Sequence, residues 1–193
     1  VDLCVRILYQ SRSELYVNMH FLDVPLSSLG FEADWNRHGL AVDGAVIYYG
    51  PEYLLGLYKK GRVLVNRAYL HMLMHCLFCH MYTRKGRDKA YWDLACDIAM
   101  ERVIDTLYSK CVHVPQSALR RETYLRIGKG LAADGAKPVF TAERIYRLLR
   151  EMNLTERRLA QLQAEFLVDS HDLWEQDGNA NQTITRQNQW NDS

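Results

Sequence analysis

The segment HMLMHCLFCH at residues 71–80 constrains the fold of this chain more than any other, because it lies within an apolar stretch over about residues 63–82. Its composition predicts a buried helix, and its uninterrupted apolar runs are shorter than the thickness of a bilayer. On a helix, residues four apart share one face and lie about 6 Å apart. His71 and His75 can therefore present their imidazoles to a single tetrahedral ion.

Two histidines do not complete a metal site, so a third ligand must come from another element. The next predicted helix, over about residues 89–108, carries Asp93, Asp97 and Glu101 along one stripe. The basic loop between the two helices is long enough to let the second helix fold back, which makes Asp97 the candidate third ligand. The alternative is that the histidines are satisfied core residues and that Asp97 is a cap or an ion-pair partner.

Three further side chains of the same segment could serve as ligands. His80 would lie about 140° around the helix from His75, which indicates packing or a contact behind the ligands. Cys76 and Cys79 form a CxxC pair, but inside a helix and without a second cysteine pair, so free buried thiols are the expectation. Cys79 follows His75 by one turn and is the better placed of the two thiols.

The rest of the pattern predicts a mostly helical α+β fold with a small sheet. In residues 39–50, Asp43 and Gly44 separate two apolar runs, and Asp-Gly favours a type I′ hairpin turn. Between Val112 and Val139, glycines and prolines indicate loops around a short element. Helices are expected over residues 2–22, 51–60, 63–82 and 89–108, with two more after the capping residues Thr141 and Thr155.

Length and charge narrow the class of protein. The chain has 193 residues, and we expect one domain over residues 1–175 followed by a polar linker or disordered tail over residues 176–193. A formal net charge of +1 gives no support for nucleic acid or an anionic membrane as a partner. Five cysteines without a regular spacing fit reduced thiols, so a cytoplasmic location is expected.

Several blocks together resemble a known family. They are AVDGAVIYYGPEYL, YLHMLMHCLFCH, RKGRDKAYWDLACDIAME, TAERIYRLL and DSHDLW. In this order and spacing they resemble the putative metallopeptidase domain of predicted bacterial metal-dependent peptidases, which also carry a C-terminal von Willebrand A-like domain. The resemblance implies a zincin-like fold, with the hairpin of residues 39–50 packed on the helix that carries the histidines. It implies zinc held by His71, His75 and Asp97, with His171 as an additional candidate ligand, and a von Willebrand A-like domain in the full-length protein.

Position 72 departs from the family pattern. The family carries HExxH, whose glutamate acts as the general base, whereas this chain has Met72. Methionine cannot accept the proton, and loss of a general base typically costs about 10²- to 10⁴-fold in rate. Glu52, Glu101 and Tyr49 are the candidate replacements.

Two functions follow as expectations. The first is a zinc-binding, metallopeptidase-like domain that is weak or inactive in hydrolysis and meets an extended peptide along an edge strand at residues 45–49. The second is a metal-free scaffold that binds other proteins without catalysis. Met72 favours the second, whereas the histidine pair and the acidic stripe favour the first.

Overall fold

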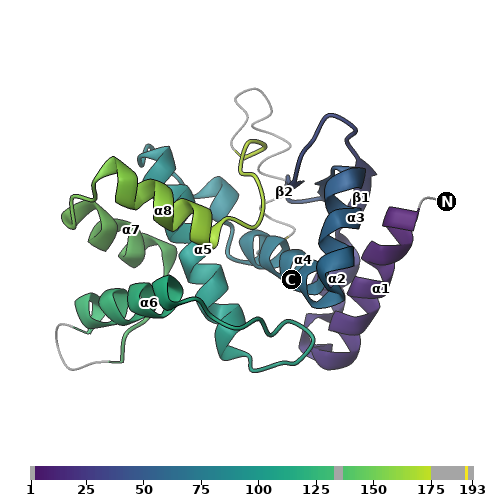
Figure 1. Cartoon of the computed structure of the whole chain (residues 1–193), viewed down its shortest axis with the longest axis horizontal. Helices are drawn as coiled ribbons and strands as arrows, with labels where there is room; N and C mark the ends of the chain where they lie inside the picture. Colours follow the sequence, from purple (N-terminus) through teal and green to yellow (C-terminus); the bar gives the residue numbers. More distant parts are fainter. Residues whose placement is uncertain (1–2, 133–136, 175–189, 191–193) are drawn as a thin grey trace. The chain divides into compact units, whose positions relative to one another are not determined.

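The computed structural model describes residues 3–132, 137–174 and 190 (Figure 1). The chain divides into two compact units. Unit 1 comprises Val1–Thr83, Tyr108–His113 and Val168–Ser193. Unit 2 comprises Arg84–Leu107 and Val114–Leu167. The two histidines predicted as ligands therefore belong to unit 1, whereas Asp97 belongs to unit 2.

Unit 1 combines helices with a small sheet. Its elements are α1 (Leu3–Asn18), η1 (His20–Leu22), α2 (Asp23–Ser28), β1 (Gly30–Ala33), β2 (Leu40–Val42), β3 (Val46–Tyr49), α3 (Pro51–Lys60), α4 (Arg62–Leu77) and η2 (His80–Tyr82). Pro51 opens α3 and Gly61 follows it, as the sequence predicts for residues 51–60. The helix predicted for residues 2–22 is present but ends at Asn18. The predicted α+β, mostly helical class is confirmed.

The sheet of unit 1 has the order β1-β3-β2, with β1 parallel and β2 antiparallel to β3. Gly30 pairs with Val46 on one side of β3, and Val42 pairs with Ile47 on the other. Residues 45–49 are therefore not an edge strand, and that prediction is wrong. The reason is β1, a short strand without a sequence prediction, which takes the free side of β3.

The hairpin between β2 and β3 lies where Asp43-Gly44 predicts it, but its turn is of another kind. A type I′ turn needs positive φ at both central residues. Gly44 has φ +92°, whereas Asp43 is not among the residues of positive φ. Instead, the Asp43 carboxylate accepts from the backbone N–H groups of Ala45 and Val46, each at 2.9 Å. Gly44 is also required by space, because a Cβ there would clash with the hydroxyl of Tyr82.

A C-terminal segment of unit 1, residues 168–174, is fixed against β2. Ser170 forms a parallel bridge with Ala41, and its N–H donates to the carbonyl of Leu40 at 2.7 Å. Arg37 donates two hydrogen bonds of 3.1 Å to the Asp172 carboxylate. Backbone pairing and a bidentate ion pair thus determine where the DSHDLW block lies.

The predicted polar tail, residues 176–193, lies outside the described residues except for Trp190. That indole is buried, and its N–H donates to the carbonyl of Gly44 at 2.7 Å. The predicted boundary at residue 175 stays a prediction.

Unit 2 is helical, with α5 (Lys89–Thr106), α6 (Ala118–Leu131), α7 (Ala142–Glu151) and α8 (Glu156–Phe166). The side chains of Thr141 and Thr155 cap α7 and α8, as predicted. Helix α6 lies in the region where glycines and prolines predict loops around a short element, and with 14 residues it is longer than expected. Gly130 is tolerated there because a Cβ at this position would meet the side chain of Leu148 on α7, so glycine allows the two helices to approach.

Arg120 forms ion pairs with acidic side chains within unit 2. Arg120 lies 2.5 Å from Glu101 and 3.0 Å from Glu165. The hydroxyl of Tyr124 donates to Asp105 at 2.9 Å. Because Glu101 is buried, this pairing offsets the cost of removing its charge from water.

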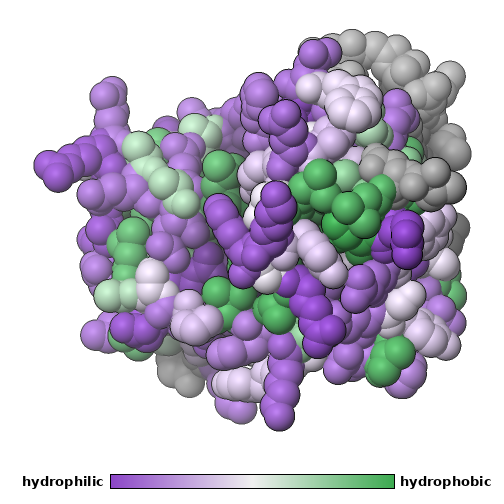
Figure 2. All heavy atoms as spheres, turned by 45° about the vertical axis from the view of Figure 1, so that its right-hand side comes forward, coloured by the Kyte–Doolittle hydropathy of each residue, from purple (hydrophilic) through white to green (hydrophobic). Residues whose placement is uncertain are grey.

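Hydrophilic side chains cover most of the face drawn in Figure 2, with smaller apolar areas between them. Among the helices of the described residues, none combines the length and the hydropathy that crossing a bilayer requires.

Candidate metal centre

Helix α4 supplies the two histidines that the sequence singles out. His71 and His75 are fully buried, one turn apart, and their Nε2 atoms lie 2.7 Å from each other. The prediction that both imidazoles share one face is confirmed. At this separation the two nitrogens either share a proton or direct their lone pairs toward a common cation.

A carboxylate from the C-terminal segment joins the two imidazoles. Oδ1 of Asp169 lies 3.5 Å from Nε2 of His71 and 3.9 Å from Nε2 of His75. Tetrahedral zinc ligands at bond lengths of about 2.0–2.1 Å lie about 3.3 Å apart. The distances among the three donor atoms fall on both sides of that value, so the group could close on one ion with small side-chain movements.

The Asp169 carboxylate is the clearest indication of a cation within unit 1. The side chain is buried, and neither oxygen accepts a hydrogen bond from the described residues. A buried carboxylate costs several kcal/mol unless it is paired or coordinates a metal. Its near neighbours include the imidazoles of His71, His75 and His171, which carry a compensating charge only if protonated. A bound metal ion would supply that charge without protonation.

His80 does not continue helix α4, contrary to the predicted helix over residues 63–82. Helix α4 ends at Leu77, and Cys79 has a left-handed backbone with φ +52°. This turn brings Nδ1 of His80 to 3.0 Å from Nδ1 of His75. The contact is on the ring nitrogen that faces away from His71, in agreement with the expectation that His80 lies behind the ligands.

His171 and Trp174 lie beside the group. Their rings stack with centroids 3.5 Å apart and an interplanar angle of 12°. Nε2 of His171 is 3.7 Å from Oδ1 of Asp169, and its ring is 5.0 Å from that of His75. His171 thus contacts the centre, and its role as an additional ligand stays a prediction.

Asp97 lies buried on α5, in unit 2. The other two carboxylates of its predicted stripe are engaged within that unit. Asp93 pairs with Lys89 at 2.6 Å, and Glu101 pairs with Arg120. The ligand role of Asp97 stays a prediction from the sequence.

The thiols of the CxxC pair are poor ligands in this setting. Burial, and then the charges of Asp169 and Asp43, raise the pKa of Cys76 well above its usual value. Burial also raises the pKa of Cys79. Because metals bind the thiolate, both shifts oppose coordination.

The candidate replacements for a general base are not favoured by their surroundings. Glu52 is exposed on α3, Tyr49 is buried in β3, and Glu101 is paired with Arg120. Met72 itself is fully buried, next to His71 in α4. Burial, and then the charge of Asp169, raise the pKa of Tyr53 on α3. No sequence pattern indicated this tyrosine.

Asp169 is a candidate ligand that was not predicted from the sequence. A usable signal exists in the DSHDLW block. The bridge at Ser170 is strand-like, and residues two apart in a strand point to the same side. The spacing of Asp169 and His171 therefore indicates that both side chains face the same group.

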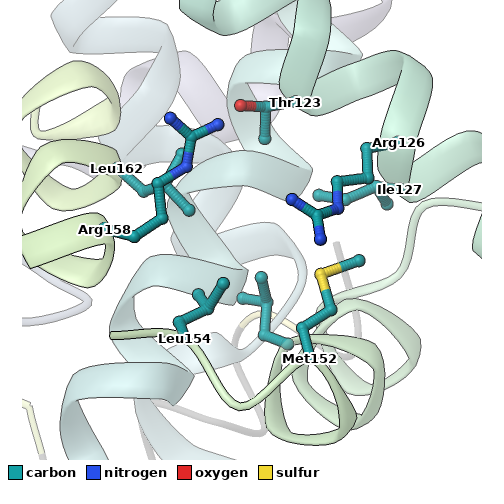
Figure 3. A pocket seen from close by; sticks show the side chains of 8 residues that line it. Thr123, Arg126, Ile127, Met152, Leu154, Arg158 and Leu162 are labelled. Carbon is teal, nitrogen blue, oxygen red and sulfur yellow. The ribbon is translucent and has the colours of Figure 1, made fainter. Parts of the chain in front are cut away.

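A separate pocket lies inside unit 2 (Figure 3), and its volume is about 20 Å³. This is room for roughly one water molecule. It is lined by Thr123, Arg126, Ile127, Leu149, Met152, Leu154, Arg158 and Leu162. These residues offer no carboxylate, imidazole or thiol, so the pocket is not a second metal centre.

Comparison with known proteins identifies a family. Residues 10–189 match a family model described as "Putative metallopeptidase domain". The matched range includes both histidines of α4, Asp97 and Asp169. No curated protein and no solved structure matches the chain.

Proposed function

The chain belongs to the family of putative metallopeptidase domains, and from that premise we propose that it binds zinc and is weak or inactive in peptide hydrolysis. The observation that carries the proposal is the buried convergence of His71, His75 and Asp169. Two imidazoles and a carboxylate are a ligand set that catalytic zinc sites use.

In this proposal, Nε2 of His71, Nε2 of His75 and the carboxylate of Asp169 would hold the ion. Asp97 is proposed as a further carboxylate ligand on the strength of the family resemblance. When bound, zinc would serve as a Lewis acid for a peptide carbonyl and would lower the pKa of water at an open position. The two imidazoles and the carboxylate would hold the ion in place, and their surroundings would keep bulk water from it, since the histidines are fully buried.

Met72 is the reason for expecting impaired hydrolysis. It occupies the position of the family's glutamate, next to His71, and its thioether has no titratable proton. Metal binding does not need this side chain, because the ligands lie elsewhere. The chain would therefore retain the metal ion and lack the general base.

The alternative is a metal-free scaffold that binds other proteins. One observation favours it: at 2.7 Å, the two Nε2 atoms of His71 and His75 can satisfy each other by a hydrogen bond. The carboxylate of Asp169, which accepts no hydrogen bond from the described residues, opposes it. In either case a peptide that adds a strand would join β1 or β2, and β2 already bridges to Ser170.

Asp169→Asn tests the proposal. The exchange keeps the shape of the side chain but removes its charge. Loss of a residue that only supports a ligand lowers metal affinity by about 10- to 100-fold, and loss of a ligand should lower zinc affinity by at least as much. Without metal, the variant should be as stable as the parent or more stable, because it removes a buried carboxylate that accepts no hydrogen bond from the described residues. Isothermal titration with zinc and thermal unfolding in a chelator measure the two quantities.

The matched control is Asp23→Asn, which removes the same charge from an exposed position on α2. Its zinc affinity should equal that of the parent. Equal affinity of Asp169→Asn and the parent, or a loss of metal-free stability in Asp169→Asn, would instead assign a structural role to this carboxylate.

A further inference from the structure

The geometry points to His80 as a positioning residue that accepts a hydrogen bond from His75 and thereby holds the metal-binding nitrogen of His75 in place. This inference rests on the proposed function, since it takes zinc at Nε2 of His75. The contact joins the two Nδ1 atoms at 3.0 Å, and both rings are buried. A ligand histidine commonly donates its other N–H to such a partner, and this partner fixes the tautomer and the ring orientation.

The pairing dictates the tautomers of both rings. A neutral imidazole has one donor and one acceptor nitrogen. If Nε2 of His75 offers its lone pair to an ion, the proton must reside on Nδ1. Nδ1 of His80 then accepts that proton's hydrogen bond, so the proton of His80 must reside on its Nε2. Zinc at His75 therefore determines the protonation pattern one ring further away.

An unfavourable backbone conformation places His80 in this position, and no sequence pattern indicates it. If α4 continued, residue 80 would lie about 140° around the helix from residue 75. Instead Cys79 takes a left-handed conformation, uncommon for a residue other than glycine, and η2 begins at His80. The hydroxyl of Thr83 donates to the carbonyl of Cys79 at 3.1 Å, which stabilises the turn. The helix break thus turns His80 back toward His75.

Three substitutions at position 80 separate hydrogen bonding from packing. His80→Ala removes the acceptor. His80→Asn retains one close to the place of Nδ1, because its side-chain oxygen is at the same distance from the backbone. His80→Gln moves the acceptor to the place of Nε2. His113→Ala is the control, since it removes an exposed imidazole of the same unit.

Zinc affinity is measured by competition with a chelating dye, together with thermal unfolding of each metal-free variant. His80→Ala and His80→Gln should bind zinc about 10- to 100-fold more weakly than the parent. His80→Asn should remain within a few-fold of the parent, and His113→Ala should be unchanged. In the zinc-loaded parent, nitrogen NMR of the histidine rings should show His75 protonated at Nδ1 and His80 protonated at Nε2.

Each other outcome contradicts the inference in a recognisable way. Equal affinity of His80→Ala and the parent would remove the positioning role and leave the zinc site intact. If His80→Asn were as weak as His80→Ala, or His80 carried its proton on Nδ1, the ring would act through packing alone. If the parent bound no zinc, the proposed function would fail and this role with it.

Discussion

His75→Ala is expected to lose its zinc on dialysis. The unmodified chain should retain about one zinc ion per chain under the same conditions. The effect should be the largest of any single change, because His75 acts on both sides of its ring. Nε2 faces His71 and Asp169, and Nδ1 pairs with His80. We expect the affinity to fall by more than about 100-fold, which corresponds to about 2.7 kcal/mol. Elemental analysis and calorimetric titration measure the loss.

Because His75 is fully buried, the control must separate ligand loss from a cavity. His75→Gln fills a similar volume and should also lose zinc. His38→Ala removes an exposed imidazole and should keep it. A His75→Gln chain that is folded and carries the full zinc content would contradict the assignment of this side chain as a ligand.

Met72→Glu is expected to create or strongly increase zinc-dependent cleavage of an unfolded protein substrate. The gain should be about 10²- to 10⁴-fold, the range that a positioned general base contributes. The site at residue 72 is fully buried, and burial raises the pKa of a carboxyl group toward neutrality. A base of that kind would be matched to proton transfer near pH 7. Release of fluorescence from a labelled, unfolded substrate, with and without a chelator, measures the activity.

The matched control for this gain is Met72→Gln, which has nearly the same size as the glutamate variant but cannot take up the proton. It should be no more active than the unmodified chain. If Met72→Glu bound zinc and cleaved nothing, the site would lack more than its base. If the unmodified chain already cleaved as fast, methionine would not be the limiting feature.

The elements that local patterns determine were predictable from the sequence. The helix predicted over residues 63–82 places His71 and His75 on one face, although α4 ends at Leu77. Thr141 and Thr155 cap their helices as hydroxyl side chains can. The position of the hairpin followed from Asp43-Gly44. In each case the interacting residues are neighbours in the chain, so the sequence contains the whole interaction.

Features that depend on distant partners were not predictable in the same way. Strand β1 is only four residues long and exists through its pairing with β3. Helix α6 contains two glycines, and packing against α7 outweighs their low propensity. Asp169 reaches the histidines through the bridge between Ser170 and Ala41, a contact between residues far apart in the chain.

The position of His80 could not be predicted from the sequence for a different reason. A single left-handed residue, Cys79, ends α4, and nothing in the local composition requires that conformation. The helical extrapolation therefore gave the wrong direction for His80, although the expectation of a supporting contact agrees with the bond to His75. The ligand role of Asp97 and the identity of the ion as zinc stay predictions.

Anomalous diffraction at the zinc absorption edge, from crystals of the unmodified chain grown with zinc, tests the central claim most directly. We expect one strong peak at bonding distance from Nε2 of His71, Nε2 of His75 and the carboxylate of Asp169. The map would also show whether Asp97 contacts the ion. A map without a peak at these atoms, with the two imidazoles still joined by their own hydrogen bond, would contradict the account and favour the metal-free scaffold.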